Sequence, residues 1–487
     1  MLAAHGSGLR INLTKEVVLS ISGGERSLYA SGKPRFLQIR LKGGASKALV
    51  SLGIARISER FQMVERPRFF YGWIIVGMSF ISMTLIYGVR HAFSVFFPPL
   101  LNEFGWNRGS TAIMLSLNVL TYGLLAPIAG SSGDRWKPRR IMLSGIMILG
   151  LATAGCALAN RLWHFYLLFG VLVSLGTAFS GWPLLTPTLT NWFAKKRGLV
   201  LGLGQMGGGL SFSYSIFAEF FISHLGWRLA YVVLAVILLG ILLPLYLFIF
   251  HYRPEDKGLN AYGITESPAD NDLPPEISDN EDYKHTDWTL GRAMLTYQLW
   301  LMVLSNFLFW GIGCYLVFAH QVKYAIDAGY SNMFGASVFA LFGVFMVIGQ
   351  FSSGISDRIG RENTITVSTI LALVAFVALL SVKDTYQPWL LYLYATCFGC
   401  GVGLYSPTAF AGMADLFYGK HFGGIAALLL TGMGIGGAVG PWLGGYIYDI
   451  SGSYRGAFIL CMACFVLACI AAWIAAPRNA GKLRRRP

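Results

Sequence analysis

Two basic residues stand side by side, Arg90-His91, inside an apolar run that extends from Phe70 to Phe97. Burying charge in hydrocarbon costs several kcal/mol, so an ionisable residue within such a run is a candidate for function. A guanidinium offers a fork of donors that matches a carboxylate, and an imidazole titrates near neutral pH. The pair would suit an organic anion that moves with a proton. The alternative is that Arg90 lies at an interface, where it snorkels or pairs structurally.

Two more ionisable residues within apolar runs join His91 as candidates for proton coupling. Glu219 lies in one run and His320 in another. Glu219 could instead pair locally with His224 or Arg228, and the sequence favours this structural interpretation. His91 and His320 together suggest a site at the outer mouth.

Polar and aromatic residues within other apolar runs are further candidates to contact a substrate. Aromatic belts and helix packing are the competing explanation for such residues. The candidates are Tyr122, Trp182, Gln205, Asn306, Trp310, Gln350 and Tyr405.

Long apolar runs must position all of these side chains. Hydrophobic residues make up 55% of the 487 positions and charged residues 13%, whereas soluble domains carry about 25% charged residues. A helix needs about 20 apolar residues to cross a bilayer. Twelve runs are long enough, at 70–97, 108–132, 141–159, 163–191, 199–223, 228–250, 297–322, 332–355, 364–382, 388–414, 422–447 and 455–475. The sequence therefore predicts an all-α membrane protein with twelve transmembrane helices in two six-helix bundles.

The remaining segments divide the chain. Residues 1–66 are basic and without a membrane-length run, so we expect a disordered extension; a basic regulatory tail is the alternative. The first bundle then covers 67–250 and the second 296–476. An acidic, Pro- and Asp-rich stretch at 251–295 cannot bury enough surface to fold alone and is expected to be a flexible cytoplasmic linker. A basic cytoplasmic tail covers 477–487.

Basic residues are concentrated in alternate loops. If the N-terminus is cytoplasmic, the inward loops carry clusters such as Lys195-Lys196-Arg197, while the outward loops carry few basic residues. This bias predicts that both termini are cytoplasmic, in a multi-pass protein of the plasma (inner) membrane. It also explains the net charge of +15 without a nucleic-acid partner. We expect a monomer whose partners are the lipid bilayer, a small organic anion and protons.

Enzymatic chemistry is not indicated. The sequence shows no nucleophile–base constellation and no metal-ligand cluster, so we expect neither catalytic residues nor a metal or cofactor. The CxxC pairs Cys397/Cys400 and Cys461/Cys464 lie in apolar runs, where small helix residues are the simpler interpretation. No GxxxxGK[ST] phosphate loop is present, which argues against a primary pump.

The two halves of the chain repeat each other. The loop GSSGDRWKPRR, with Asp134, has a counterpart in SGISDRIGR, with Asp357, 223 positions later. Glycine-rich runs precede Arg228 and Arg455, which are 227 positions apart. A nearly constant offset indicates duplication and therefore pseudo-symmetric bundles.

These features together resemble the major facilitator superfamily (MFS): the repeated Asp-Arg loop, the glycine-rich fifth and eleventh runs, and the acidic linker. The resemblance covers about residues 66–478. The segments YGWIIVGMSF, GVRHAFSVFFPPL, NEFGWNRGS, NWFAKKRGLVLGLG and GPWLGGYIYDISGSY are similar to those of the monocarboxylate porter and oxalate/formate antiporter groups. The resemblance implies the MFS fold and secondary transport.

Family motifs also imply roles for particular residues. The repeated loops should form a charge network that acts as a cytoplasmic gate, made of Asp134, Arg135, Arg139, Asp357, Arg358 and Arg361. The cation of the first span aligns with His91. In the eighth span, the positions of the family's acidic residue and arginine hold Met346 and Gln350, so this chain departs from the family there. A dicarboxylate held by two basic residues is therefore not expected.

We expect a secondary active transporter of small organic anions, monocarboxylates above all, by proton-coupled symport or exchange through alternating access. The substrate site should lie between the halves near mid-membrane. Two alternatives stay open. The uncharged eighth and eleventh spans would suit an exporter of hydrophobic or amphipathic compounds, and the acidic linker or basic tail could serve a non-transporting membrane sensor.

Overall fold

The structure is a computed structural model that describes residues 70–135, 137–194, 197–263, 288–417 and 422–477. The side chains of 131, 133–135 and 197–198 are outside this description. The described residues are almost entirely helical, and their β-structure is a single bridge between Phe193 and Tyr262.

The first half forms six membrane-length helical stretches, several of which are interrupted. Its elements are α2 (Gly72–His91), α3 (Phe93–Phe104), α4 (Arg108–Arg135), α5 (Pro138–Gly155), η1 (Cys156–Leu158), α6 (Leu162–Phe165), η2 (Tyr166–Val173), α7 (Ser174–Ser180), α8 (Trp182–Trp192), α9 (Arg197–Leu210), η3 (Ser211–Ser213), α10 (Tyr214–Pro244), η4 (Leu245–Ile249) and the short η5 (Pro254–Lys257).

The second half repeats this pattern after a short helix. Its elements are α11 (Leu290–Met294), α12 (Tyr297–Asn306), η6 (Phe307–Cys314), α13 (Tyr315–Asp327), α14 (Asn332–Ser352), η7 (Ser353–Ile355), α15 (Ser356–Ile359), α16 (Arg361–Ser381), α17 (Pro388–Phe417), α18 (Phe422–Ser451) and α19 (Arg455–Ala475).

The twelve predicted runs all form helices. Ten helical segments of the described residues are long and apolar enough to cross a membrane. One of them, Leu199–Ile249, holds two predicted runs that meet at Gly226, where a φ of 77° interrupts the helix. A positive φ favours glycine because it lacks a Cβ atom. The one predicted run outside these ten segments, 388–414, forms α17 (Pro388–Phe417).

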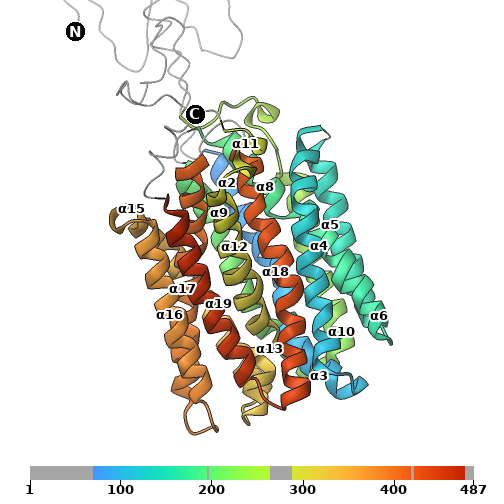
Figure 1. The fold of residues 1–487 in the computed structure, drawn as a ribbon. Helices are drawn as coiled ribbons and strands as arrows, with labels where there is room; N and C mark the ends of the chain where they lie inside the picture. The colour runs from blue at the N-terminus through green and yellow to red at the C-terminus, as the bar shows by residue number, and fades with distance from the viewer. Residues whose placement is uncertain (1–69, 136, 195–196, 264–287, 418–421, 478–487) are drawn as a thin grey trace, which may run out of the picture. The chain divides into compact units, whose positions relative to one another are not determined.

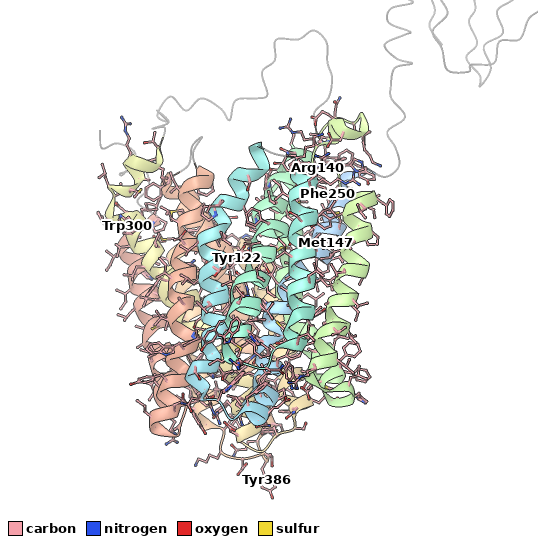
Figure 2. All side chains as sticks on the ribbon, turned by 90° about the vertical axis from the view of Figure 1, so that its right-hand side faces the viewer. Tyr122, Arg140, Met147, Phe250, Trp300 and Tyr386 are labelled. Atoms are coloured by element: carbon pink, nitrogen blue, oxygen red, sulfur yellow. The ribbon has the colours of Figure 1, made fainter. Side chains whose placement is uncertain are left out.

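Neighbouring helices run along each other for most of their length, and their loops gather at two opposite ends (Figure 1). We call the end that carries α11 and residues 250–263 the linker end, and the opposite end, where α3 and α13 finish, the far end. Figure 2 places Tyr122 between Arg140, toward the linker end, and Tyr386, at the far end.

The two halves meet along three sets of helices. α4 packs on α18, as Figure 1 shows, α3 packs on α13, and α9, η3 and α10 pack on α14. The α4–α18 contact is close because glycine faces glycine: a Cβ atom on Gly123 would lie 2.7 Å from the Cα of Gly434. Such small residues let membrane helices approach without a gap. Gly434 belongs to the glycine-rich eleventh run, so one function of that run is close packing against the first half.

The start of the interhalf linker packs against the first half. Backbone hydrogen bonds join Tyr262 to Trp192 and Ala194, and the Lys257 ammonium lies 3.9 Å from the Tyr71 ring. Residues 251–263 are therefore held against the first half, with the Phe70 ring on Tyr262, although many of these residues remain exposed. Residues 264–287 lie outside the described residues.

Candidate functional site

Arg90 is buried between helices of the first half rather than exposed at an interface. Its side chain is 1% exposed, and its Nε donates a hydrogen bond of 2.6 Å to Oδ1 of Asn118 on α4. The Asn118 amide is fixed in turn, because its Nδ2 donates to the Phe169 carbonyl at 2.7 Å. The snorkelling alternative for Arg90 is therefore wrong, and Asn118 holds the guanidinium in one orientation.

Two tyrosines flank the same guanidinium. Its central carbon lies 4.5 Å from the ring centroid of Tyr122 and 5.5 Å from that of Tyr87. Their hydroxyls are 2.6 Å apart. Tyr315, on α13 of the second half, is a further neighbour, and its hydroxyl interacts with the guanidinium. Aromatic faces attract a cation but leave its N–H donors unused.

Within the described part of the chain, the terminal nitrogens of Arg90 lack a hydrogen bond of ordinary geometry. Nη1 and Nη2 are both buried, and the Tyr315 hydroxyl lies near them. The ion pairs resolved in the structure engage other arginines, Arg108, Arg228 and Arg361. Leaving a charged donor unpaired in a medium of low dielectric costs free energy that an anionic ligand would recover.

His91 faces a different set of elements from Arg90. Its Nδ1 lies 2.7 Å from Oγ of Ser211 in η3, and its ring stacks on Phe212 at 3.7 Å with an interplanar angle of 9°. Phe318 of α13 contacts the ring edge-on, with centroids 6.3 Å apart. The imidazole therefore lies where η3 of the first half meets α13 of the second.

The remaining polar and aromatic candidates for substrate contact fall into two groups. Asn306 donates to the Leu429 carbonyl at 2.6 Å, and the Tyr405 hydroxyl lies 2.7 Å from Ser305 while its ring stacks on Phe309. Both side chains are committed to packing within the second half. Trp182, Gln205, Trp310 and Gln350 are only partly buried.

Gln350 lies close to the first half. A Cβ atom on Gly209 would lie 3.3 Å from Gln350 Oε1, an oxygen that is buried without a donor within the described part of the chain. Met346, one helical turn earlier on α14, is 5% exposed. The interface therefore offers a neutral amide where the family pattern would place an arginine.

Glu219 and His320 are both buried, and both connect elements of the bundle. Glu219 interacts with Asn332, the first residue of α14, across the interface between the halves. Local pairing is wrong, because Arg228 pairs with Glu103, and His224 contacts Ser223 and the Phe220 carbonyl. The structure does not bring His320 into a shared contact with His91.

Both ring nitrogens of His320 are engaged. Nε2 lies 2.8 Å from the Pro441 carbonyl, and Nδ1 lies 3.1 Å from the hydroxyl of Tyr454. Because a carbonyl only accepts hydrogen bonds, Nε2 carries the proton. His320 therefore joins α13 to α18 by a hydrogen bond, and its ring also contacts Phe97 of the first half.

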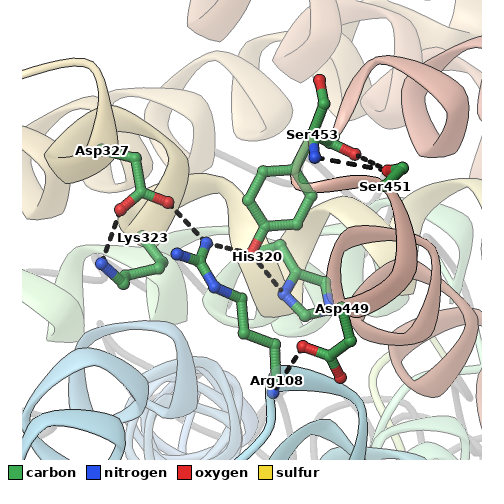
Figure 3. A network of polar contacts seen from close by, with 8 residues as sticks. Arg108, His320, Lys323, Asp327, Asp449, Ser451 and Ser453 are labelled. Atoms are coloured by element: carbon green, nitrogen blue, oxygen red, sulfur yellow. Dashed lines mark hydrogen bonds and ion pairs between the residues drawn. The ribbon is translucent and has the colours of Figure 1, made fainter.

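A polar network joins the halves at the far end (Figure 3). Arg108 pairs with Asp327 at 2.5 Å and donates to the Tyr454 hydroxyl at 2.9 Å. Asp449, at the end of α18, accepts from the backbone amides of Arg108 and Gly109, at 3.0 and 2.8 Å. A carboxylate is favourable at the N-terminus of a helix, here α4. We call Arg108, Asp327, Asp449 and Tyr454 the far-end latch.

At the linker end, the resolved pairs lie within single halves. Arg361 binds Asp357 at 2.6 Å and Asp415 at 2.9 Å, while Arg139 donates to the Tyr246 carbonyl. Arg358 is exposed. The side chains of Asp134 and Arg135 lie outside the described residues, so the structure does not test their part of the predicted gate.

Sequence reasoning missed Asn118, Ser211 and the far-end latch. Asn118 and Ser211 are neutral and lie in runs rich in small polar residues, so nothing in the sequence distinguishes them. Arg108 and Asp449 could be recognised only as loop charges. Their spacing along the chain carries no signal of their contact.

Comparison with known proteins identifies the relatives of this chain. The family model of the Major Facilitator Superfamily matches residues 72–423 and 355–487. Monocarboxylate transporter 13 of Bos taurus is 24% identical over 412 residues, covering 83% of this chain and 89% of its own length. Monocarboxylate transporter 2 of Homo sapiens is 24% identical, covering 82% and 84%. These relatives are transporters rather than enzymes.

A solved structure confirms the fold. The bacterial homolog of the human lysosomal transporter Spinster, in an inward-facing and unoccupied conformation, matches with a TM-score of 0.58 at 16% identity. The match covers 86% of this chain and 98% of that one. With its apolar helices, its two six-helix halves and the family match, this chain belongs to the major facilitator superfamily and is a multi-pass membrane transporter.

Proposed function

We propose that this protein carries small organic anions, monocarboxylates above all, across a membrane by alternating access, coupled to protons or in exchange. One observation carries the proposal: the guanidinium of Arg90 is buried, at 1% exposure, and its two terminal nitrogens have no carboxylate and no hydrogen bond of ordinary geometry among the described residues, with the Tyr315 hydroxyl near them. The relatives of this protein named above are monocarboxylate transporters, and this supports the same class of substrate.

The geometry of Arg90 favours one carboxylate over two. Nε is occupied by Asn118, which leaves the Nη1–Nη2 edge for two parallel hydrogen bonds to a planar anion. Tyr122 covers a face of the guanidinium, with its ring centroid 4.5 Å away. Gln350 adds a neutral group at the interface between the halves. A second carboxylate would find no second permanently charged cation among these residues.

Alternating access would use the two ends of the bundle in turn. The far-end latch holds the halves together there, so the described conformation corresponds to one closed at the far end. We assign the linker end to the cytoplasm, because Arg139, Arg140 and Arg361 gather there and basic loops stay inside. A monomer in the plasma membrane is sufficient for this cycle.

The direct test is uptake by proteoliposomes containing the full chain. A panel would pair each labelled monocarboxylate with its neutral amide of nearly equal shape, with and without an inward proton gradient. Acid uptake that saturates, with no uptake of the amide, supports the proposal. Equal uptake of both members of a pair would overturn the anion assignment.

A second candidate, export of amphipathic compounds, rests on α14. This helix carries no charged residue from Asn332 to Ser352 and buries Met346 at 5% exposure. Partly buried Trp182 and Trp310 would suit an apolar solute. Inhibition of the carrier by lipophilic cations, together with indifference to pyruvate, would favour this function over the first.

A further inference from the structure

Ser211 connects His91 to a backbone carbonyl. Its Oγ lies 2.7 Å from Nδ1 of His91 and 2.5 Å from the carbonyl oxygen of Gly208. Ser211 is fully buried in η3, the short segment between α9 and α10. The Ser211 hydroxyl therefore has two hydrogen-bond partners, and it can donate to one and accept from the other.

The proton positions follow from this arrangement. A carbonyl oxygen only accepts, so the single proton of the Ser211 hydroxyl must point at Gly208. The same Oγ can then only accept from His91, which requires the proton of a neutral imidazole to reside on Nδ1. Nε2 is left as the proton-accepting nitrogen.

The ring cannot exchange its two nitrogens easily. Phe212 stacks on one face at 3.7 Å, and Phe318 approaches edge-on from α13. Nε2 makes no hydrogen bond to any described residue, and the side chain retains 8% of its surface. Protonation at Nε2 would leave the Ser211 contact intact, so a proton can arrive and leave without the ring turning.

In the part of the chain that the structure describes, Arg90 is the charged residue that acts on His91. Arg90 precedes it on α2 and acts on it electrostatically, while η3 presents Ser211 and Phe212, and α13 presents Phe318. Tyr87, also on α2, lies 6.4 Å away between ring centroids. Two adjacent positive charges repel each other at short range in a medium of low dielectric. An anion on Arg90 would cancel that repulsion and favour a proton on His91.

We propose that Ser211 is a positioning residue that fixes the Nδ1–H tautomer of His91, so that Nε2 takes up a proton when an organic anion binds Arg90. This rests on the proposed transport function and specifies its coupling. The proton passes from water to Nε2 when the site is loaded and returns to water on the other side when the anion leaves. Anion and proton thus move together, with no net change in the protein.

The experiment compares two modes of transport by the full chain in proteoliposomes, with labelled pyruvate as the probe. Uptake driven by a proton gradient requires His91 to load and unload, whereas exchange of pyruvate for pyruvate does not. Ser211→Ala should lower gradient-driven uptake by roughly tenfold or more, the size of effect seen at metal sites when a histidine loses the hydrogen bond that orients it. Exchange should change by less than about threefold, and Ser211→Thr should restore uptake and its pH profile.

Ser79→Ala is the matched control. Ser79 is also fully buried, but its hydroxyl donates only to the Ile75 carbonyl of its own helix. The control should preserve both modes of transport. If Ser211→Ala retains the wild-type ratio of the two modes and the wild-type pH profile, the positioning role is contradicted.

A second measurement does not depend on transport. Nitrogen-15 NMR of histidine-labelled protein, with the His91 signal assigned by its loss in His91→Gln, distinguishes the two tautomers. Wild type and Ser211→Thr should show a proton on Nδ1, and Ser211→Ala a mixture. A proton on Nε2 in neutral wild type would overturn the proposal. Correct tautomers without any monocarboxylate transport would instead contradict only the transport function.

Discussion

Arg108 of the first half and Asp327 of the second form an ion pair of 2.5 Å at the far end. The position equivalent to Asp327 in the first half is Glu103, 224 residues earlier and thus within the offset of the repeat. Glu103 binds Arg228 and Trp227 of its own half. The same acidic position therefore stabilises one half internally and, in the other half, joins the two halves together.

Removing Arg108 should release the far end. Arg108→Gln loses a partly exposed ion pair worth roughly 1 kcal/mol, which shifts the balance between the two access states by about fivefold. Spin labels on Arg161→Cys and Tyr386→Cys, one in each half, would report the far-end separation by pulsed electron resonance. In Arg108→Gln, a larger fraction of molecules should show the longer distance between the two labels.

Arg228→Gln is the control for this measurement, because Arg228 pairs within the first half. It should leave the distance distribution unchanged. Equal distributions for Arg108→Gln and wild type would show that the latch does not hold the far end closed.

Asn118→Asp should weaken anion binding with almost no change of volume. The new carboxylate oxygen would take the place of Asn118 Oδ1, 2.6 Å from Arg90 Nε. Its negative charge would pair with the guanidinium and compete with the substrate anion. We expect the KM for pyruvate to rise by roughly tenfold or more. Asn363→Asp, an exposed position on α16, adds the same charge elsewhere and should transport normally. A normal KM in Asn118→Asp would show that the substrate does not bind at Arg90.

Glu219 and His91 can be distinguished as proton sites by neutral replacements. Glu219→Gln keeps the contact with Asn332 and should retain gradient-driven uptake. His91→Gln cannot take up a proton and should lose gradient-driven uptake while exchange continues. The reverse pattern, with coupling lost only in Glu219→Gln, would move the proton site to α10.

Gly434→Ala should slow transport. The added methyl would lie 2.7 Å from the Cα of Gly123, so α4 and α18 would have to move apart. We expect a loss of roughly tenfold in uptake, accompanied by a lower melting temperature. Gly77→Ala is the matched change, because nothing lies within 4 Å of a Cβ atom there. A normal rate for Gly434→Ala would mean that this close approach is dispensable.

Hydropathy and repetition predicted most of the fold. The apolar runs ended within a few residues of the helices, and the repeat of Asp134 at Asp357 indicated two halves. Arg90 and His91 could be found because charge within an apolar run is costly. Each of these signals is local or periodic, so one sequence is sufficient to show it.

The partners of these residues could not be predicted, because they depend on packing. Asn118 reaches Arg90 from another helix, and Arg108 reaches Asp327 across 219 positions. Tyr405 and Asn306 carry the same polar groups as substrate-binding residues, yet their hydrogen bonds to Ser305 and Leu429 commit them to the second half. Residue type alone does not distinguish these fates.

The central claim is that Arg90 binds the transported anion, and pyruvate uptake by Arg90→Ala in proteoliposomes tests it most directly. We predict a loss of at least about a hundredfold in kcat/KM, with Arg90→Lys recovering part of it, because an ammonium keeps the charge but lacks the planar fork. Melting temperature would confirm that both variants fold. Wild-type uptake by folded Arg90→Ala would contradict the claim.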